Sequence, residues 1–315
     1  MRRPPRVLWL TMAALAAVSG CASAQPDTAA TPLPKPPAFS GRLSPEALDM
    51  VTRSGSWPRA QQTLDTAVNK LVHRCMKDKG FTYPAKRAPL PTSLDDTAAV
   101  VDLPGRRRHG YAIATTPRQS GPPPAPYYTA LPPDRKRSFD LAFSGPADSG
   151  DDVSTGAGTV RVRRQGCDAE ARRALTGDVT VWARMYYTPE ALNGRLDAKV
   201  PKAREYTAAM SAWRSCMAAR GHAYRTPEEA RDSLNRRFLE NKDRKGASKE
   251  EFRKREKQVA VADGECAIEA DVPGAAVRVR RGLIATLPKK DQAALAELAS
   301  YQSEAVKRAE TLLGR

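Results

Sequence analysis

The sequence predicts a mainly α-helical fold, disulfide-stapled and built from two related cysteine frames. Apolar residues recur at three- and four-residue spacing over 57–79 and 202–220, as on one face of an amphipathic helix. Capping boxes begin at Thr226 and Ser248, and each is typical of a helix start. Cysteine motifs recur in the two halves. A long proline-rich irregular excursion, 84–133, is expected within the first frame.

The N-terminal segment has the layout of a secretory signal. Arg2, Arg3 and Arg6 precede an apolar run over 7–18, and this run is too short to cross a bilayer as a helix. The residues that follow, Val18-Ser19-Gly20-Cys21, resemble the lipobox of bacterial lipoproteins. We therefore expect residues 1–20 to be a lipoprotein signal peptide, and Cys21 to carry the lipid. That anchor predicts a location on the outer face of the cytoplasmic membrane, with the membrane as first partner.

A second cleavage site competes with the lipobox. Ala22-Ser23-Ala24 is a small-residue site of the kind that ordinary signal peptidase cuts. Cleavage there would release a soluble, secreted protein that begins at Gln25. The lipid-anchored interpretation is preferred because the cysteine directly follows the apolar run, with serine and glycine before it.

The rest of the chain divides into three expected parts. Residues 21–55 are expected to form the lipidated cysteine and a disordered tether, because six prolines lie between Gln25 and Pro45. The first cysteine frame is expected over 56–200. The second frame and a C-terminal helix are expected over 201–315, and the two frames either stay separate or pack as one domain.

Within the first frame, the expected elements are a helix, a proline-rich loop and a second helix. The first helix covers 57–79 and ends at Gly80, which suits the residue after a helix. The loop contains Arg106-Arg107-Arg108-His109, which we interpret as a solvated loop segment. A short helix is expected over 133–143, and Val160 and Val162 alternate with arginines as in a brief strand.

The second frame shows clearer helix signals. Helices are expected over 202–220, 227–245, 249–270 and 291–313. Ten basic and five acidic residues lie between Arg236 and Lys257, and a charge run of this kind is typical of a solvated helix face.

Four cysteines remain after Cys21, and in an oxidising compartment they predict two disulfides. C-M-x-x-x-G-x-x-Y occurs at Cys75 and again at Cys216, and C-x-x-E-A occurs at Cys167 and again at Cys266. Four cysteines allow three pairings. The repeat favours Cys75 with Cys167 and Cys216 with Cys266. No C-x-x-C pair is present, and no metal site is expected.

Together these cysteine frames, with the proline-rich middle and the lipobox, resemble a group of uncharacterised exported lipoproteins of actinobacteria. The likeness covers most of residues 56–275. It implies a secreted, disulfide-bonded, mainly helical lipoprotein, and it implies no catalytic residues.

The net charge of the chain and the absence of catalytic sequence motifs narrow the classes of function that we expect. The formal charge is +17, and removing the three arginines of the signal leaves +14. Such a field favours anionic wall polymers, lipid headgroups or another envelope protein as partners, and nucleic acid is not expected at this location. A GC-rich genome would also give many arginines. No G-x-S-x-G, H-E-x-x-H or P-loop motif occurs. We therefore expect a non-enzymatic binding protein without a cofactor; the alternative is an envelope enzyme whose site no motif reveals.

Overall fold

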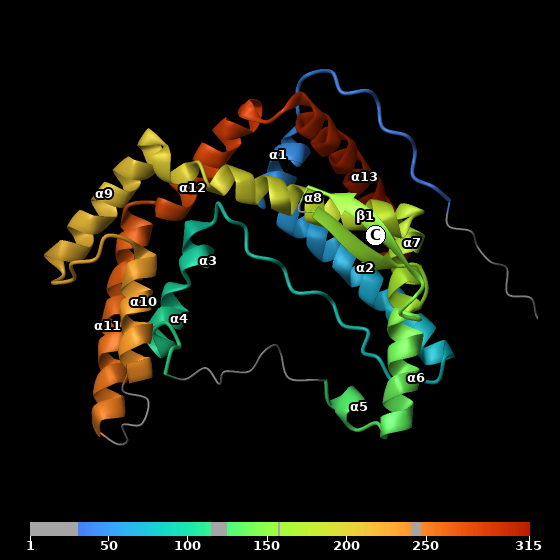
Figure 1. The fold of residues 1–315 in the computed structure, drawn as a ribbon, viewed down its shortest axis with the longest axis horizontal. Helices are drawn as coiled ribbons and strands as arrows, with labels where there is room; N and C mark the ends of the chain where they lie inside the picture. The colour runs from blue at the N-terminus through green and yellow to red at the C-terminus, as the bar shows by residue number, and fades with distance from the viewer. Residues whose placement is uncertain (1–30, 115–124, 157, 241–246) are drawn as a thin grey trace, which may run out of the picture.

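The computed structural model describes residues 31–114, 125–156, 158–240 and 247–315. The signal peptide and Cys21 lie outside these residues. The fold is mainly helical, as predicted, with one two-stranded antiparallel sheet among the described residues. The helices form two lobes joined by α8 and α12 (Figure 1).

The larger lobe is built around α2, α8 and α13. Its core combines apolar residues from distant parts of the sequence, including Leu64 of α2, Leu192 of α8 and Leu298 of α13. Each of these side chains is at most 1 % exposed. The elements of this lobe are α1 (Pro45–Thr52), α2 (Trp57–Asp78), α5 (Pro126–Thr129), α6 (Pro133–Ser144), β1 (Gly150–Thr155), β2 (Gly158–Arg163), α7 (Cys167–Thr176), α8 (Val179–Asp197) and α13 (Lys289–Leu313).

The smaller lobe is built around α9 and α11. Trp213 and Met217 of α9 are fully buried against Cys266 and neighbouring residues of α11. Its elements are α3 (Thr97–Val101), α4 (Leu103–His109), α9 (Arg204–Ala219), α10 (Pro227–Glu240) and α11 (Ala247–Glu269). Helix α12 (Val272–Leu283), flanked by the short η1 (Val200–Lys202) and η2 (Ile284–Thr286), contacts both lobes.

The duplicated C-M-x-x-x-G motif forms the same helix end in both lobes. Gly80 and Gly221 have φ values of 74° and 77°, a left-handed conformation that glycine adopts without a Cβ penalty. The residue after each glycine donates its backbone N–H to the carbonyl of Met76 or Met217, at 2.8 and 2.9 Å. This shared cap places the early cysteine of each frame in the last turn of its helix.

Both predicted disulfides are confirmed. Cys75 is bonded to Cys167, the first residue of α7, and Cys216 of α9 is bonded to Cys266 in the last turn of α11. The Cα atoms of each pair are 5.6 Å apart, within the usual range for a disulfide. Each bond therefore ties the end of one helix to a second helix of the same lobe.

The disordered tether expected over 21–55 does not reach residue 55 in the structure, because its C-terminal part contains a helix. Residues 45–52 form α1, which begins with Pro45 and is capped by Ser44, whose hydroxyl accepts the N–H of Ala47 at 3.2 Å. Ala47 and Val51 are fully buried in the larger lobe. The burial of this short apolar face outweighs the flexibility implied by the preceding prolines.

The lobes also do not divide at residue 200. Helices α3 and α4, expected in the first frame, pack against α11 of the smaller lobe. Helix α13, expected with the second frame, contacts α2, α7 and α8 of the larger lobe. The chain therefore passes between the lobes more than once, because each lobe completes its core with a helix from the other half of the sequence.

The proline-rich excursion is more ordered than predicted. Residues 84–93 lack regular structure, but α3, α4 and α5 follow, and Arg106–His109 belong to α4 rather than to a loop. Asp102 caps α4 by accepting the N–H of Gly105 at 3.0 Å. The strand at Val160 and Val162 is confirmed as β2, and β1, which the sequence did not reveal, pairs with it.

Candidate functional site: a basic surface on α4 and α11

Two buried carboxylates on α11 hold the segment 106–113 in place. Glu256 and Asp263 are both 1 % exposed and lie seven residues apart, two turns along one helix face. A buried carboxylate is costly unless it is paired or hydrogen-bonded. Both of these acids find partners in the segment 106–113, and Asp263 has a further partner in α9.

Asp263 accepts from three side chains. Arg106 forms an ion pair with it, and Tyr111 Oη and Trp213 Nε1 each donate to it at 2.9 Å. The guanidinium of Arg106 also donates to the carbonyl of Ala260 at 3.1 Å and lies over the Tyr111 ring. Burial, with the nearby Asp263 carboxylate, raises the pKa of Tyr111, so its hydroxyl stays a donor.

Glu256 accepts the backbone N–H of Ile113 at 2.6 Å. Burial raises the pKa of Glu256, and its backbone hydrogen bonds oppose that shift. Gly110, with a φ of +65°, packs against this residue, and a Cβ there would lie 3.0 Å from Glu256 Cγ and 3.3 Å from its backbone carbonyl carbon. The close approach of α4 to α11 thus depends on a glycine at this position.

This docking gathers basic side chains from two separate stretches of sequence. We define the basic surface as Arg108 and His109 of α4 with Lys254 and Lys257 of α11, which line one depression together. All four side chains are exposed, and none forms an ion pair with another described residue. By contrast, Arg106 and Arg107 are paired with Asp263 and Glu265.

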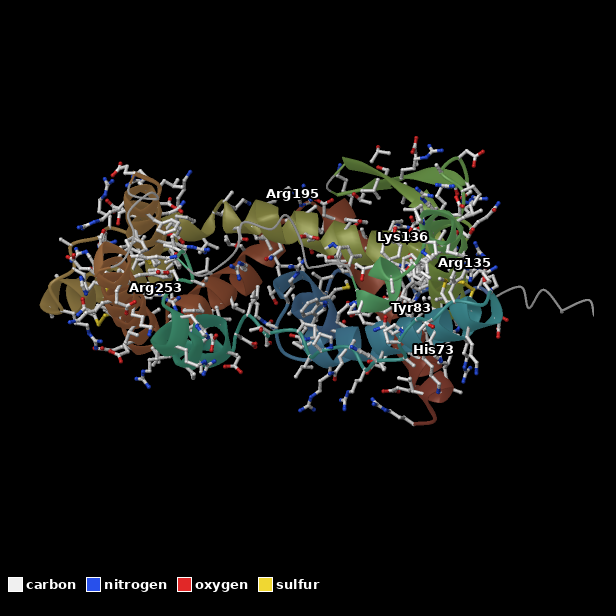
Figure 2. All side chains as sticks on the ribbon, turned by 90° about the horizontal axis from the view of Figure 1, so that it is seen from below. His73, Tyr83, Arg135, Lys136, Arg195 and Arg253 are labelled. Carbon is white, nitrogen blue, oxygen red and sulfur yellow. A yellow bond between two sulfur atoms is a disulfide. The ribbon has the colours of Figure 1, made fainter. Side chains whose placement is uncertain are left out.

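A depression of about 790 Å³ lies within this surface. Arg253 lines it, and its buried Nε atom has no hydrogen-bond partner in the described part of the chain. Figure 2 shows Arg253 in the smaller lobe, far from His73 and Tyr83 in the larger lobe. The depression also contains Glu250 and Glu251, so its own lining carries both signs of charge. The guanidinium of Arg253 is ion-paired with Glu250 at 3.5 Å through its Nη1 atom.

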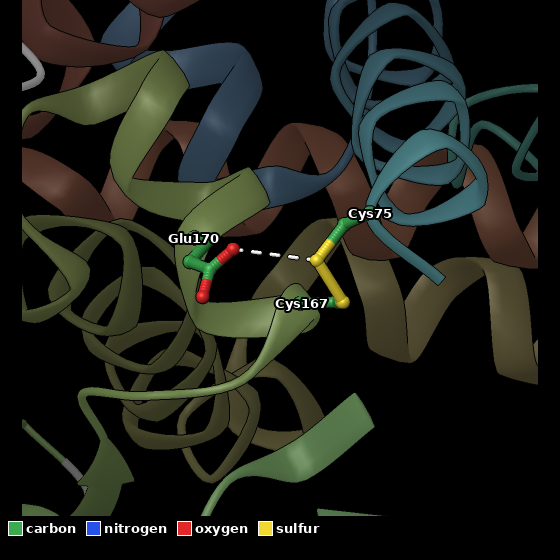
Figure 3. Close-up of side chains that lie close together, drawn as sticks. All are labelled: Cys75, Cys167 and Glu170. Carbon is green, nitrogen blue, oxygen red and sulfur yellow. Dashed lines mark hydrogen bonds between the residues drawn. A yellow bond between two sulfur atoms is a disulfide. The ribbon is translucent and has the colours of Figure 1, made fainter. Parts of the chain in front are cut away.

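The sulfur atoms of the Cys75–Cys167 disulfide are not available as thiolate ligands for a metal ion. Among the residues that the structure describes, the one group of potential ligand atoms within common reach is Cys75, Cys167 and Glu170 (Figure 3). Both sulfur atoms are bonded to each other and are not thiolates.

Sequence reasoning found the charged residues but not their arrangement. The sequence predicts two independent solvated segments, 106–109 and 236–257, whereas the structure packs α4 against α11. Glu256 and Asp263 were not recognised as the residues that join them. A usable signal existed, since both acids share a helix face with the fully buried Val259 and Ala260. Cys21, the predicted lipidation site, lies outside the described residues.

Within the described ranges, no helix is both long and apolar enough to cross a membrane. No family model matches the chain, and neither a curated protein nor a solved structure matches it. The functional assignment therefore rests on the residues of this chain.

Proposed function

We propose that this protein is an exported, lipid-anchored binding protein of the cell envelope, without enzymatic activity. In this proposal Cys21 holds it at the outer face of the cytoplasmic membrane. The basic surface binds the phosphate or carboxylate groups of an anionic envelope polymer. The observation that carries the proposal is the gathering of Arg108, Lys254 and Lys257, without ion pairs among the described residues, around one depression that Arg253 also lines.

The physical basis is electrostatic. Exposed cations without a carboxylate partner attract a polyanion at short range, and the attraction weakens as salt shortens the screening length. Arginine adds paired N–H donors that match phosphate and carboxylate groups. Two disulfides, the lipobox-like segment and the proline-rich residues before α1 support a location outside the reducing cytosol.

The experiment measures retention of the chain, with Cys21→Ser and without residues 1–20, on purified cell wall and on vesicles. One set of vesicles contains anionic phospholipid and the other only zwitterionic phospholipid. We expect retention on the wall or on anionic vesicles at low ionic strength, and release by salt. Comparison of retention on the cell wall with retention on the anionic vesicles identifies whether wall polymers or lipid headgroups supply the anionic groups.

A triple variant, R108E/K254E/K257E, should lose this retention. The matched control K35E/K289E/K290E makes the same charge change at exposed residues outside the basic surface and should bind like the parent. Equal retention of both variants, or no retention of the parent at low salt, contradicts the proposed binding.

The anchor has a separate test. Mass spectrometry of the mature N-terminus should show a diacylglyceryl group on Cys21. An unmodified chain beginning at Gln25 would instead show cleavage after Ala24 and release.

A further inference from the structure

A second cavity lies in the larger lobe. This groove, with a volume of about 770 Å³, is formed by α2, α6, α7, α8 and β2, and by the segment after α2. Its size falls in the range typical of small-ligand sites. The groove and the basic surface lie in different lobes and share no lining residue.

Aromatic rings line much of the groove. Tyr186 and Tyr187 of α8 are 50 % and 37 % exposed, and their rings lie 5.0 Å apart in an edge-to-face arrangement. Tyr83 and Phe143 line the same groove with stacked rings 5.7 Å apart. The groove thus offers several flat apolar faces to a ligand.

The arginines of the groove are already engaged. Arg172 forms an ion pair with Asp168 at 2.9 Å, although its buried Nε makes no hydrogen bond within the described residues, and its guanidinium covers the ring of Trp182. Arg163 donates to a backbone carbonyl at 2.6 Å, and Arg161 is paired with an aspartate of β1. The groove therefore lacks the free positive charge that marks the basic surface, and it is poorly suited to a polyanion.

Other polar groups of the groove have spare hydrogen-bonding capacity. Asp65 of α2 accepts one hydrogen bond, from Gln61 Nε2 at 2.9 Å, although it is half-buried. The hydroxyl groups of Tyr83, Tyr186 and Tyr187 have no hydrogen-bond partner in the described ranges. A carboxylate and several hydroxyl groups thus lie beside aromatic faces, ready to bind a ligand rich in donors and acceptors.

We propose that this groove binds an uncharged oligosaccharide. A sugar ring presents an apolar C–H face, which stacks on tyrosine, and hydroxyl groups, which donate to Asp65 and accept from the tyrosine hydroxyls. This combination matches both classes of group in the groove, and an uncharged ligand suits arginines that are already paired. Tyr186 and Tyr187 stack on the sugar, while Asp65 and Gln61 fix its orientation.

The experiment is a calorimetric titration of the chain with Cys21→Ser and without residues 1–20. The probes are the tetramer of N-acetylglucosamine, maltotetraose and, as a comparison, uncharged tetra-alanine with blocked ends. At least one of the two sugars should bind saturably with a Kd below about 1 mM. Y186A/Y187A and D65N should each weaken it by about tenfold or more. L141A, which truncates an apolar residue 56 % exposed outside the groove, should leave it unchanged.

Three results overturn the inference: no binding of either sugar by the parent chain, equal binding by Y186A/Y187A, or binding of the peptide alone. Circular dichroism of every variant establishes that each is folded. The basic-surface variant R108E/K254E/K257E should bind sugar like the parent, so that failure of the groove and failure of the proposed polyanion binding give different results.

Discussion

The Oε2 atom of Glu170 lies 3.3 Å from the Sγ of Cys75, a sulfur that has no hydrogen to donate because it is bonded to Cys167. The second frame repeats the arrangement, with Glu269 Oε2 at 3.4 Å from Cys216 Sγ. Each glutamate is the acid of its C-x-x-E motif. In both disulfides the early cysteine is partly exposed and the late one fully buried, so the carboxylate lies beside the sulfur that a reductant reaches first.

These glutamates should slow reduction of the disulfides. An attacking thiolate is repelled by the carboxylate, and the repulsion of two unit charges at this distance in water is about 1 kcal/mol, or up to roughly fivefold in rate. E170Q and E269Q should therefore each speed thiol release from the adjacent disulfide by dithiothreitol, most strongly at low salt. E46Q, at an exposed glutamate of α1, is the control. Rates that match the parent at every salt concentration would rule out this protective role.

Removing the carboxylate of Asp263 should strongly destabilise the protein. D263A leaves the guanidinium of Arg106 and the indole N–H of Trp213 without their buried acceptor. Breaking one side of a buried ion pair costs about 3 to 5 kcal/mol. Urea denaturation should show this loss for D263A, while D232A, at an exposed aspartate of α10, should change the free energy of unfolding little. A small effect of D263A would show that the network contributes little.

Glu256 predicts a pH dependence of stability. Burial raises its pKa above the ordinary 4.5 in the folded state, so the folded protein holds this proton more tightly than the unfolded chain. Its contribution is fully present below the unfolded pKa and is lost as the pH rises through the folded pKa. E256Q cannot ionise, and its free energy of unfolding should improve relative to the parent as the pH rises above the ordinary 4.5. If the free energies of unfolding of E256Q and the parent change with pH in parallel, the raised pKa of Glu256 is contradicted.

The glycines that end α2 and α9 should tolerate alanine poorly for conformational reasons alone. A Cβ at Gly80 or Gly221 meets nothing within 4 Å, but both residues have positive φ. G80A and G221A should each cost about 1 kcal/mol of unfolding free energy. Gly194, inside α8 with equally open surroundings and no positive φ, is the matched control. G194A should stabilise by up to about 1 kcal/mol, because alanine favours the helix.

The sequence predicted α2, α9 and α13 to within about two residues because each has a regular apolar face, and α2 and α9 are followed by a glycine. The disulfide pairing was predictable because the two frames repeat. Helix α8 was missed because Pro189 lies inside it and tyrosines interrupt its apolar pattern. Helix α1 was not predicted, because the prolines around it favour a disordered tether.

The candidate sites were less accessible to sequence reasoning. The partners of Asp263 lie 50, 152 and 157 residues away in the chain, and no local pattern links such positions. The groove draws its residues from several elements, and the tyrosines and carboxylates in it have no fixed spacing. Only the fold brings them together. Helical periodicity places Glu256 and Asp263 on the buried face of α11, but it does not identify their partners.

Helix α13 has a consequence for the order of folding. Its fully buried Leu295 and Leu298 pack with residues of α1 and α2, more than two hundred positions earlier. A chain that emerges with its N-terminus first cannot complete the larger lobe until these leucines arrive. Until then the apolar faces of α1 and α2 lack their cover, and the Cys75–Cys167 bond is the one covalent restraint on that lobe among its described residues. A chaperone that binds the uncovered apolar faces of α1 and α2 would therefore act before α13 docks. After docking, α13 covers these faces.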